Sequence, residues 1–451
     1  MGVDQDYKNI LTHASRVALA DGWGGAMLAT ELQDVLFGTP YPGRGEMNMG
    51  VLKKDQVNII VHGHEPILSE MIAAASQDEE LLEEARKVGA KGINVAGTCC
   101  TANELLMRHG IPIAGNFLNQ ELVIATGAIE LMAVDVQCVM QGLTQVAKCY
   151  HTKLVTTADK ARIPGVEHIA INEKTALKTA KELVRMAIGN YKNRGQVYIP
   201  ADKKAAVGGF SFESINYMLG GRFRSSFRPL NDNIINGRIR GIVGVVGCTN
   251  PKIPQDWTHV TLTKELIKRD VLILTTGCAT IACGKQGLTN PKEALELAGP
   301  GLREVCEAVG IAPVLTCGSC VDNSRLLVSC SELVREGGLG EDISDLPVAG
   351  VCLESVSEKA LAIGQYFVAS GALVVFAEEI LPISGSQNVC DYLFGGIEND
   401  LGGRWAVESD PVKAAEMILE HIESKRDALG INKEKERKLY DMEDRRALAV
   451  E

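Results

Sequence analysis

Six short apolar runs in this chain of 451 residues each end in a side chain that binds soft metals. These side chains are one imidazole and five thiols: His64, Cys100, Cys138, Cys248, Cys278 and Cys320. Thiolates together with an imidazole suit a transition metal or an iron–sulfur cluster. Six ligands are too many for one tetrahedral zinc ion, so the set favours a cluster with more than one kind of metal position.

Two of these positions have a neighbour of the same residue type. Cys99 directly precedes Cys100, and the residues alone leave either thiol as the ligand. His62 and His64 flank a glycine at the end of one run, so either imidazole remains a candidate. Cys352 also ends an apolar run and is a reserve candidate.

The segment 315–325 contains a CxxC pair, Cys317 and Cys320. Alone, this spacing fits a thiol redox pair or half of a zinc site. The five other strand-end ligands favour a different interpretation, in which Cys320 belongs to the larger set and Cys317 is an additional thiol. Three further cysteines lie in or beside helical patterns and fit ordinary core or surface thiols: Cys149, Cys306 and Cys330.

The elements that position these residues alternate between short β-branched runs and amphipathic helices from residue 57 onward. This alternation predicts parallel sheets covered by helices, whose carboxyl-end edge is where ligands bind. We predict an α/β protein with two Rossmann-like parallel-sheet domains preceded by a short helical segment. The boundaries are 1–50 for the helical segment, ending in a Gly/Pro-rich connector, 51–200 for the first domain and 201–451 for the second, which closes with a C-terminal helix charged over 433–447.

One lysine has a conspicuous place. The segment 354–367 predicts a helix with Lys359 about two turns inside it and Ile363 on the same face. A lysine is usually a solvated surface group, but this helix begins at the edge of the crevice. An ammonium facing the crevice would stabilise negative charge on a metal-bound substrate.

Charge and composition exclude several classes of protein. The net charge of −11 is spread along the chain, which argues against a nucleic-acid partner. No stretch approaches the roughly 18 to 20 apolar residues of a membrane span, and the polar N-terminus does not resemble a signal peptide. The sequence therefore predicts a cytoplasmic protein, in which the 13 cysteines are not a disulfide framework.

Seven motifs, in this order, resemble the catalytic subunit of anaerobic nickel–iron carbon monoxide dehydrogenases. They are HGHEPILSEM, GTCCTANELLMRHGIPIAGNF, DVQCVMQG, VGCTNP, TTGCATIACGK, CGSCVDNSR and SEKALAIG. The resemblance covers essentially the whole chain. It implies a Ni-4Fe-4S cluster that interconverts carbon monoxide and water with carbon dioxide, protons and electrons.

The resemblance also implies a role for each matching residue. His64 and Cys100 would hold a pendant iron, Cys320 the nickel, and Cys138, Cys248 and Cys278 the remaining irons. Lys359 and His64 would be the catalytic residues, and Ile363 would help to wall a pocket for a diatomic gas. A ferredoxin-type electron acceptor and a homodimer are expected from the family.

The chain departs from the family pattern in two ways. Family members carry an N-terminal segment whose cysteines bind further 4Fe-4S relay clusters, whereas residues 1–95 contain no cysteine. We therefore expect a shortened gene, a truncated chain, or a second chain that supplies the relay. The second departure is Cys317, where the family pattern predicts another residue type.

Two alternative functions are compatible with the sequence. One is the related hybrid-cluster class, which reduces hydroxylamine or nitrogen oxides. That class would be expected to have a carboxylate in place of Cys100. The other is a cluster-binding subunit without turnover of its own.

Overall fold

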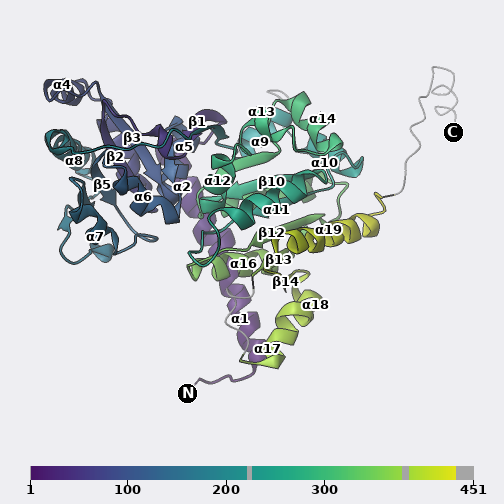
Figure 1. Cartoon of the computed structure of the whole chain (residues 1–451). Coiled ribbons are helices and arrows are strands. Elements are labelled where there is room, and N and C mark those ends of the chain that lie inside the picture. Colours follow the sequence, from purple (N-terminus) through teal and green to yellow (C-terminus); the bar gives the residue numbers. More distant parts are fainter. Residues whose placement is uncertain (1, 221–225, 378–384, 433–451) are drawn as a thin grey trace, which may run out of the picture.

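A continuous sheet of 14 strands forms the centre of the computed structural model, which describes residues 2–220, 226–377 and 385–432 (Figure 1). The strand order is β14-β13-β12-β9-β10-β11-β8-β1-β4-β3-β2-β5-β6-β7. Neighbouring strands are parallel except for the pair β1–β8, which is antiparallel. The predicted α/β class is therefore confirmed.

The first unit of the sheet comprises strands β2 to β7 and their helices. Its strands are β2 (Val57–His62), β3 (Ile93–Thr98), β4 (Ile113–Gly115), β5 (Ile129–Val134), β6 (Lys153–Thr156) and β7 (Glu167–His168). Its main helices are α3 (Pro66–Ala75), α4 (Glu79–Lys87), α5 (Cys99–His109), α6 (Gln120–Ala125), α7 (Leu143–Lys148) and α8 (Ala176–Asn190). Every residue of β2 and β5 is buried, as expected for parallel strands covered on both faces.

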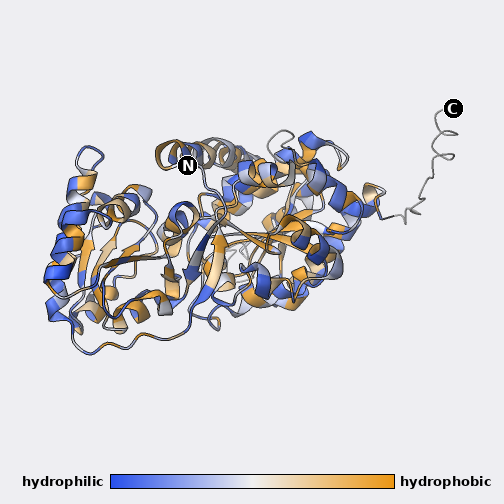
Figure 2. Cartoon of the chain, turned by 90° about the horizontal axis from the view of Figure 1, so that it is seen from above, coloured by the Kyte–Doolittle hydropathy of each residue, from blue (hydrophilic) through white to orange (hydrophobic). Residues whose placement is uncertain are grey.

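The second unit comprises strands β8 to β14. They are β8 (Lys204–Gly208), β9 (Gly241–Val245), β10 (Val271–Thr276), β11 (Val314–Gly318), β12 (Val348–Cys352), β13 (Leu373–Phe376) and β14 (Arg404–Val407). Its longer helices are α9 (Phe212–Gly220), α10 (Arg228–Ile235), α11 (Trp257–Ile267), α12 (Gly277–Lys285), α14 (Pro300–Val309), α15 (Asn323–Glu336), α16 (Lys359–Ala369) and α19 (Pro411–Ala428). Figure 2 shows apolar strands covered by helices whose outer faces are hydrophilic.

The N-terminal segment is helical, as predicted, but its connector is not a loop. Helix α1 (Tyr7–Ala20) packs on α16, and α2 (Met27–Phe37) packs on α15. Within the expected connector, strand β1 (Gly43–Met47) pairs with β8 and β4 and so joins the two units in one sheet. This glycine-containing stretch has no apolar alternation, and its strand form depends on partners that are distant in sequence.

The C-terminal helix is α19, and the charged segment 433–447 lies outside the described residues. The change from first to second unit falls between α8 and β8. In the described ranges, no helix has the length and apolar character that crossing a membrane requires.

Candidate metal centre

The carboxyl ends of β2, β3 and β11 bring three of the predicted ligands together. The ligand atoms of His64, Cys100 and Cys320 all lie within 4.8 Å of one another. The two sulfurs are 3.3 Å apart, well beyond the roughly 2.05 Å of a disulfide bond. Cys138, after β5, places its Sγ 3.9 Å from Nε2 of His64.

Cys278 and Cys248 face the same centre from the second unit. Cys278 is the second residue of α12, and a hydrogen bond with the thiol of Cys99 lowers the pKa of Cys278 to about 7. Burial, together with negative charge on Cys320 and Cys278, raises the pKa of Cys248 to about 12. All six predicted ligands therefore meet at one edge of the sheet, and the five cysteines among them are free thiols.

Lys359 extends into this group of ligands. Its Nζ lies 2.8 Å from Nε2 of His64, 3.3 Å from Oε1 of Gln137 and 4.0 Å from Sγ of Cys138. Burial alone would lower the pKa of Lys359, but negative charge on the surrounding cysteines outweighs it and raises this pKa well above the usual range. The side chain is therefore an ammonium within the ligand group.

The helix that carries Lys359 begins later than predicted. Lys359 is the first residue of α16, so the expectation that it lies about two turns inside a helix is wrong. Ser355 and Ser357 form a hydrogen-bonded turn instead, and the Ser357 hydroxyl accepts from the backbone N–H of Lys359 at 3.4 Å. Serine favours such turns over helix interiors because its hydroxyl competes for backbone groups.

The two histidines of the HGH motif have different surroundings. His64 lies among the cysteines, and although burial opposes its protonation, hydrogen bonds with Cys138 and Cys320 raise its pKa to about 9. Nε2 of His62 donates to the carbonyl oxygen of Cys138 at 3.0 Å. Burial and the charge of His64 lower the pKa of His62 to about 4, so His62 is neutral. The geometry favours His64 as the ligand.

The second unit contains an equivalent support that the sequence analysis missed. The buried side chain of His259, on α11, donates from Nε2 to the carbonyl oxygen of Cys248 at 2.6 Å. A third support is Gln120, whose Nε2 donates to the Cys138 carbonyl at 3.2 Å and whose Oε1 accepts from the N–H of Met140 at 3.0 Å. No spacing rule identifies such residues, because their partners are carbonyl groups.

The backbone at the first unit's ligands is strained. The backbone φ angles of Cys99, Gln137 and Cys138 are 60°, 61° and 53°. Residues other than glycine rarely adopt such angles. Such conformations cluster at functional sites, where the surrounding structure holds them. Gly63 (φ +134°) is required for a different reason, because a Cβ there would lie 1.7 Å from Oδ1 of Asp135. That oxygen accepts from the N–H of His64 at 2.5 Å.

Of the remaining strand-end thiols, Cys317 lies apart from the ligand group, whereas Cys352 lies beside the turn that carries Cys248. Cys317 is buried in the core of the second unit, and its Sγ donates to the carbonyl of Leu315 at 3.6 Å. Cys352 donates to the carbonyl of Glu354 at 3.3 Å. Cys317 and Cys320 thus have different surroundings, and their CxxC spacing does not define a thiol pair.

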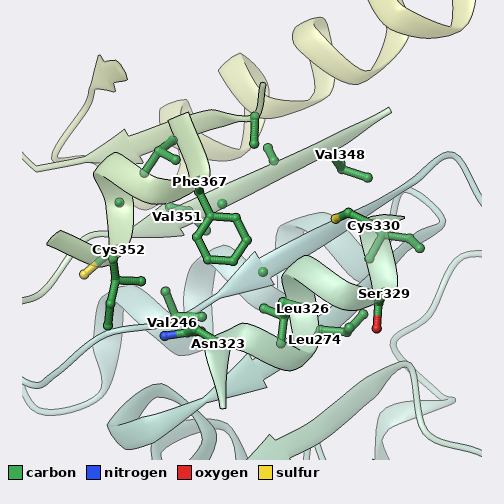
Figure 3. Close-up of a pocket in the computed structure, with 18 of the residues that line it drawn as sticks. Val246, Leu274, Asn323, Leu326, Ser329, Cys330, Val348, Val351, Cys352 and Phe367 are labelled. Carbon is green, nitrogen blue, oxygen red and sulfur yellow. The ribbon is translucent and has the colours of Figure 1, made fainter. Parts of the chain in front are cut away.

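An apolar cavity adjoins the centre on the side of the second unit. Cys248, Cys320 and Lys359 line one end of it, and Ile363 lies in the same wall. In Figure 3, Phe367 occupies the middle of the cavity, between Cys352 on one side and Cys330 on the other. The cavity extends to Val348 at the start of β12, so it runs along the sheet away from the ligands.

The residues present fit a cluster that contains soft metals. The donor atoms are sulfur and imidazole nitrogen, and those of His64, Cys100 and Cys320 are close enough to share metal ions. Nε2 of His62 is used by a backbone carbonyl, as expected for a residue that supports a ligand. The same edge also carries a cation, Lys359, that balances negative charge on thiolates.

Comparisons with known proteins agree with this geometry. The Prismane/CO dehydrogenase family matches residues 1–412. Carbon monoxide dehydrogenase 1 of Methanosarcina mazei is 54% identical over 96% of this chain and 68% of its own length. The carbon monoxide dehydrogenase of Rhodospirillum rubrum is 43% identical over 96% of this chain and 68% of its own.

A solved structure extends the likeness to three dimensions. The as-isolated, Ni-free carbon monoxide dehydrogenase from Thermococcus sp. AM4 superposes with a TM-score of 0.91 at 53% identity, covering 95% of this chain and 67% of that one. The chain therefore spans about two thirds of the length of these relatives.

Proposed function

Because the chain belongs to the Prismane/CO dehydrogenase family, we propose that it is an oxidoreductase that interconverts carbon monoxide and water with carbon dioxide, protons and electrons. The observation that carries this proposal is the meeting of His64, Cys100 and Cys320 within 4.8 Å, beside an ammonium and at the end of an apolar cavity. Neither the cation nor the cavity is needed for a purely structural metal site.

We propose that the centre holds a Ni-4Fe-4S cluster. His64 and Cys100 would hold a pendant iron, Cys320 the nickel, and Cys138, Cys248 and Cys278 the other irons. When bound, such a cluster supplies Lewis acidity and a reservoir for electrons. His62, Gln120 and His259 would fix the cysteine turns through their carbonyl groups.

Lys359 is the proposed catalytic cation. Its ammonium lies within 4.0 Å of both His64 and Cys138, so a substrate oxygen at this place would lie within reach of it. Reduction of carbon dioxide, or hydration of carbon monoxide, places negative charge on oxygen. A charge-assisted hydrogen bond from Nζ stabilises that charge without any rearrangement of the protein.

The cavity suits the proposed substrate. Its lining beyond Cys248, Cys320 and Lys359 is mostly aliphatic or aromatic and includes Ile363 and Phe367. A small uncharged gas enters such a space without desolvation of polar groups, whereas ions do not. Lys359 and Ile363 lie one helical turn apart, so charge and apolar wall reach the centre from the same helix.

The wider setting follows from the same family. We propose a ferredoxin-type electron acceptor, a homodimer, a cytoplasmic location and further 4Fe-4S relay clusters whose ligands lie outside this sequence. The two electrons of each turnover must leave the buried centre, which requires such a relay. Operation in either direction is compatible with the arrangement of Lys359 and the cavity.

The hybrid-cluster alternative is not favoured. A thiol, Cys100, lies where that class would be expected to have a carboxylate, and the curated relatives described above are carbon monoxide dehydrogenases. An experiment distinguishes the proposed enzyme from a cluster-binding subunit without turnover.

The test is CO-dependent reduction of methyl viologen by nickel-loaded protein prepared without oxygen. We expect reduction that requires both carbon monoxide and nickel. A cluster spectrum with no viologen reduction would support the non-turnover subunit. Reduction of hydroxylamine without CO oxidation would favour the hybrid-cluster class.

A further inference from the structure

A cluster of five buried ionisable side chains lies next to Cys100 and Cys320 in the chain and in space. We call it the charge cluster, and it consists of Asp34, Glu104, Arg108, Asp322 and Arg325. None of these side chains is more than 5% exposed. Burying charge is costly unless the charges are paired, so such a group needs an explanation.

Asp34, on the N-terminal helix α2, is the centre of the charge cluster. Its Oδ1 accepts from Nη2 of Arg108 and from Nη2 of Arg325, both at 2.7 Å, and its Oδ2 accepts from Nη1 of Arg325 at 2.8 Å. Arg108 belongs to α5, whose first turn contains Cys100, and Arg325 belongs to the first turn of α15, directly after Cys320. One carboxylate therefore ties together the two elements that carry these sulfurs.

The pairing continues to the turn that contains Cys320. Asp322 accepts from Nε of Arg325 at 2.9 Å, and from the N–H and hydroxyl of Ser319 at 2.7 and 2.9 Å. Next to Asp34 on α2, the hydroxyl of Thr30 shares a hydrogen bond of 2.7 Å with Ser324. The residues on both sides of Cys320 are thus tied into the charge cluster, and Ser324 and Arg325 contact α2 directly.

The charges of the charge cluster balance. Burial, with the charge of Asp322, raises the pKa of Glu104 to about 8, so its carboxyl is mostly protonated at neutral pH. Asp34 and Asp322 then offset Arg108 and Arg325. The Asp34 carboxylate pairs with the guanidinium groups of both Arg108 and Arg325. Without its charge, these two groups would repel each other across the gap between α5 and α15.

We propose that Asp34 is a positioning residue, which sets the separation of the Cys100 and Cys320 sulfurs and thereby the affinity of the centre for the metal ions that these two sulfurs hold. The proposal rests on the proposed function only for the identity of these ions, iron at Cys100 and nickel at Cys320. It assigns to the N-terminal helical segment a part in building the site, although that segment supplies no ligand.

The test compares metal binding by the parent chain and by Asp34→Asn, which has the same shape but no charge. Cobalt(II) is titrated into metal-free protein, and the thiolate-to-cobalt absorption is followed. Nickel, iron and sulfide per chain are measured separately on protein prepared without oxygen. We expect cobalt affinity and nickel content to fall by about 10-fold, as for other residues that orient ligands, with a much smaller change in sulfide.

Glu130→Gln is the matched control. Glu130 is a buried carboxylate paired with Arg194 at 2.7 Å, but it lies at the amino end of β5, away from the ligands. The Glu130→Gln variant should have a lower free energy of unfolding than the parent chain and an unchanged affinity for cobalt. If Asp34→Asn does not fold, Arg325→Lys keeps the charge and loses the two parallel bonds to Asp34, and the same loss of affinity is expected.

Parent-like cobalt affinity in folded Asp34→Asn or Arg325→Lys would overturn the proposal, as would a parent chain that binds no cobalt through its thiols. An equal loss in Glu130→Gln would also overturn it, because the effect would then be general destabilisation. If the parent binds cobalt in an Asp34-dependent way but neither takes up nickel nor oxidises CO, the proposed function fails and the positioning role stands.

Discussion

The two units of the sheet each deliver three ligands to the centre, but they hold them by different means. In the first unit, Gly63 precedes His64, but the non-glycine residues Cys99, Gln137 and Cys138 also adopt left-handed backbone conformations. In the second unit, glycines take that role, and Gly247 and Gly277 directly precede the ligands Cys248 and Cys278. A Cβ on Gly277 would lie only 2.8 Å from Sγ of Cys320.

The surroundings of the ligands differ in the same sense. Polar groups surround the first unit's turns, where Asp135 binds the N–H of His64 and Gln120 binds the carbonyl of Cys138. The second unit borders the apolar cavity. The comparison indicates a division of roles, in which the first unit fixes metal positions and the second provides space for the substrate.

The largest effect on activity is expected from removing Lys359, the cation that the second unit extends toward the first. Lys359→Ala should lower CO oxidation by about 100- to 1,000-fold, the usual cost of removing a group that stabilises charge on oxygen. Metal content should be unchanged, because Lys359 is not a ligand. Lys413→Ala, on the exposed face of α19, is the control and should keep parent activity. Equal activity in both variants would remove Lys359 from the mechanism.

The next largest effect is expected from replacing His62 and His259, the two histidines that donate to carbonyl groups of ligands. His62→Phe and His259→Phe should each weaken metal retention, by roughly 10- to 100-fold, because each removes a donor to a ligand's carbonyl group. The loss should be larger for His62, since the Cys138 turn is strained and that of Cys248 is not. Iron retained against a chelator is the measurement. A larger loss for His259 would contradict the assignment of metal positioning to the first unit.

A smaller effect is expected from narrowing the cavity. Gly350 lines the cavity, and a Cβ there would meet Val374 only at 3.7 Å, so Gly350→Ala adds a methyl group without a clash. We expect KM for CO to rise by up to about 10-fold with little change in kcat. Gly189→Ala adds the same group on α8, where a Cβ would meet nothing within 4 Å. The second-unit cavity has no role in substrate access if both variants keep the parent KM.

The smallest expected effect concerns stability in acid. In the second unit, burial and Lys425 lower the pKa of His421 to about 4, so its stabilising contribution is complete above the unfolded pKa of 6.5 and is lost as the pH falls toward 4. At pH 5 the unfolded chain is protonated at this residue and the folded chain is not. The cost is at most roughly 2 kcal/mol.

His421→Gln should therefore reduce the drop in Tm between pH 7 and pH 5. The first unit offers a control of opposite sign, because a hydrogen bond with Glu70 raises the pKa of His109. His109 stabilises the fold below pH 6.5 and loses this contribution as the pH rises through its folded pKa, so His109→Gln should enlarge the drop in Tm. An equal drop in Tm for the two variants would refute the opposite signs of the two histidine contributions.

The positions of the ligands could be predicted from the sequence, because parallel strands bring their carboxyl ends to one edge. The alternation of strands and helices was therefore enough to predict that Cys138 and Cys320 lie at the same edge, although they are distant in the chain. The choice between His62 and His64 was not predictable, since it depends on the carbonyl of Cys138. Strand β1 was missed for a similar reason, as its pairing with β8 leaves no trace in hydrophobic alternation.

Other features of the site depend on contacts with no sequence signature. The roles of Gln120 and His259 come from bonds to backbone carbonyls, and the cavity comes from the packing of α15 and α16 against the sheet. The start of α16 at Lys359 reflects a local serine turn that helical periodicity does not reveal.

The most direct test of the central claim is metal analysis of the chain prepared without oxygen. If the six strand-end ligands hold one mixed cluster, the protein should contain roughly one nickel with about four irons and a matching amount of acid-labile sulfide per chain. Cys278→Ala should lower all of them together, although Cys278 is far in sequence from Cys320. Zinc alone, with metal content unaffected by Cys278→Ala, would contradict the account.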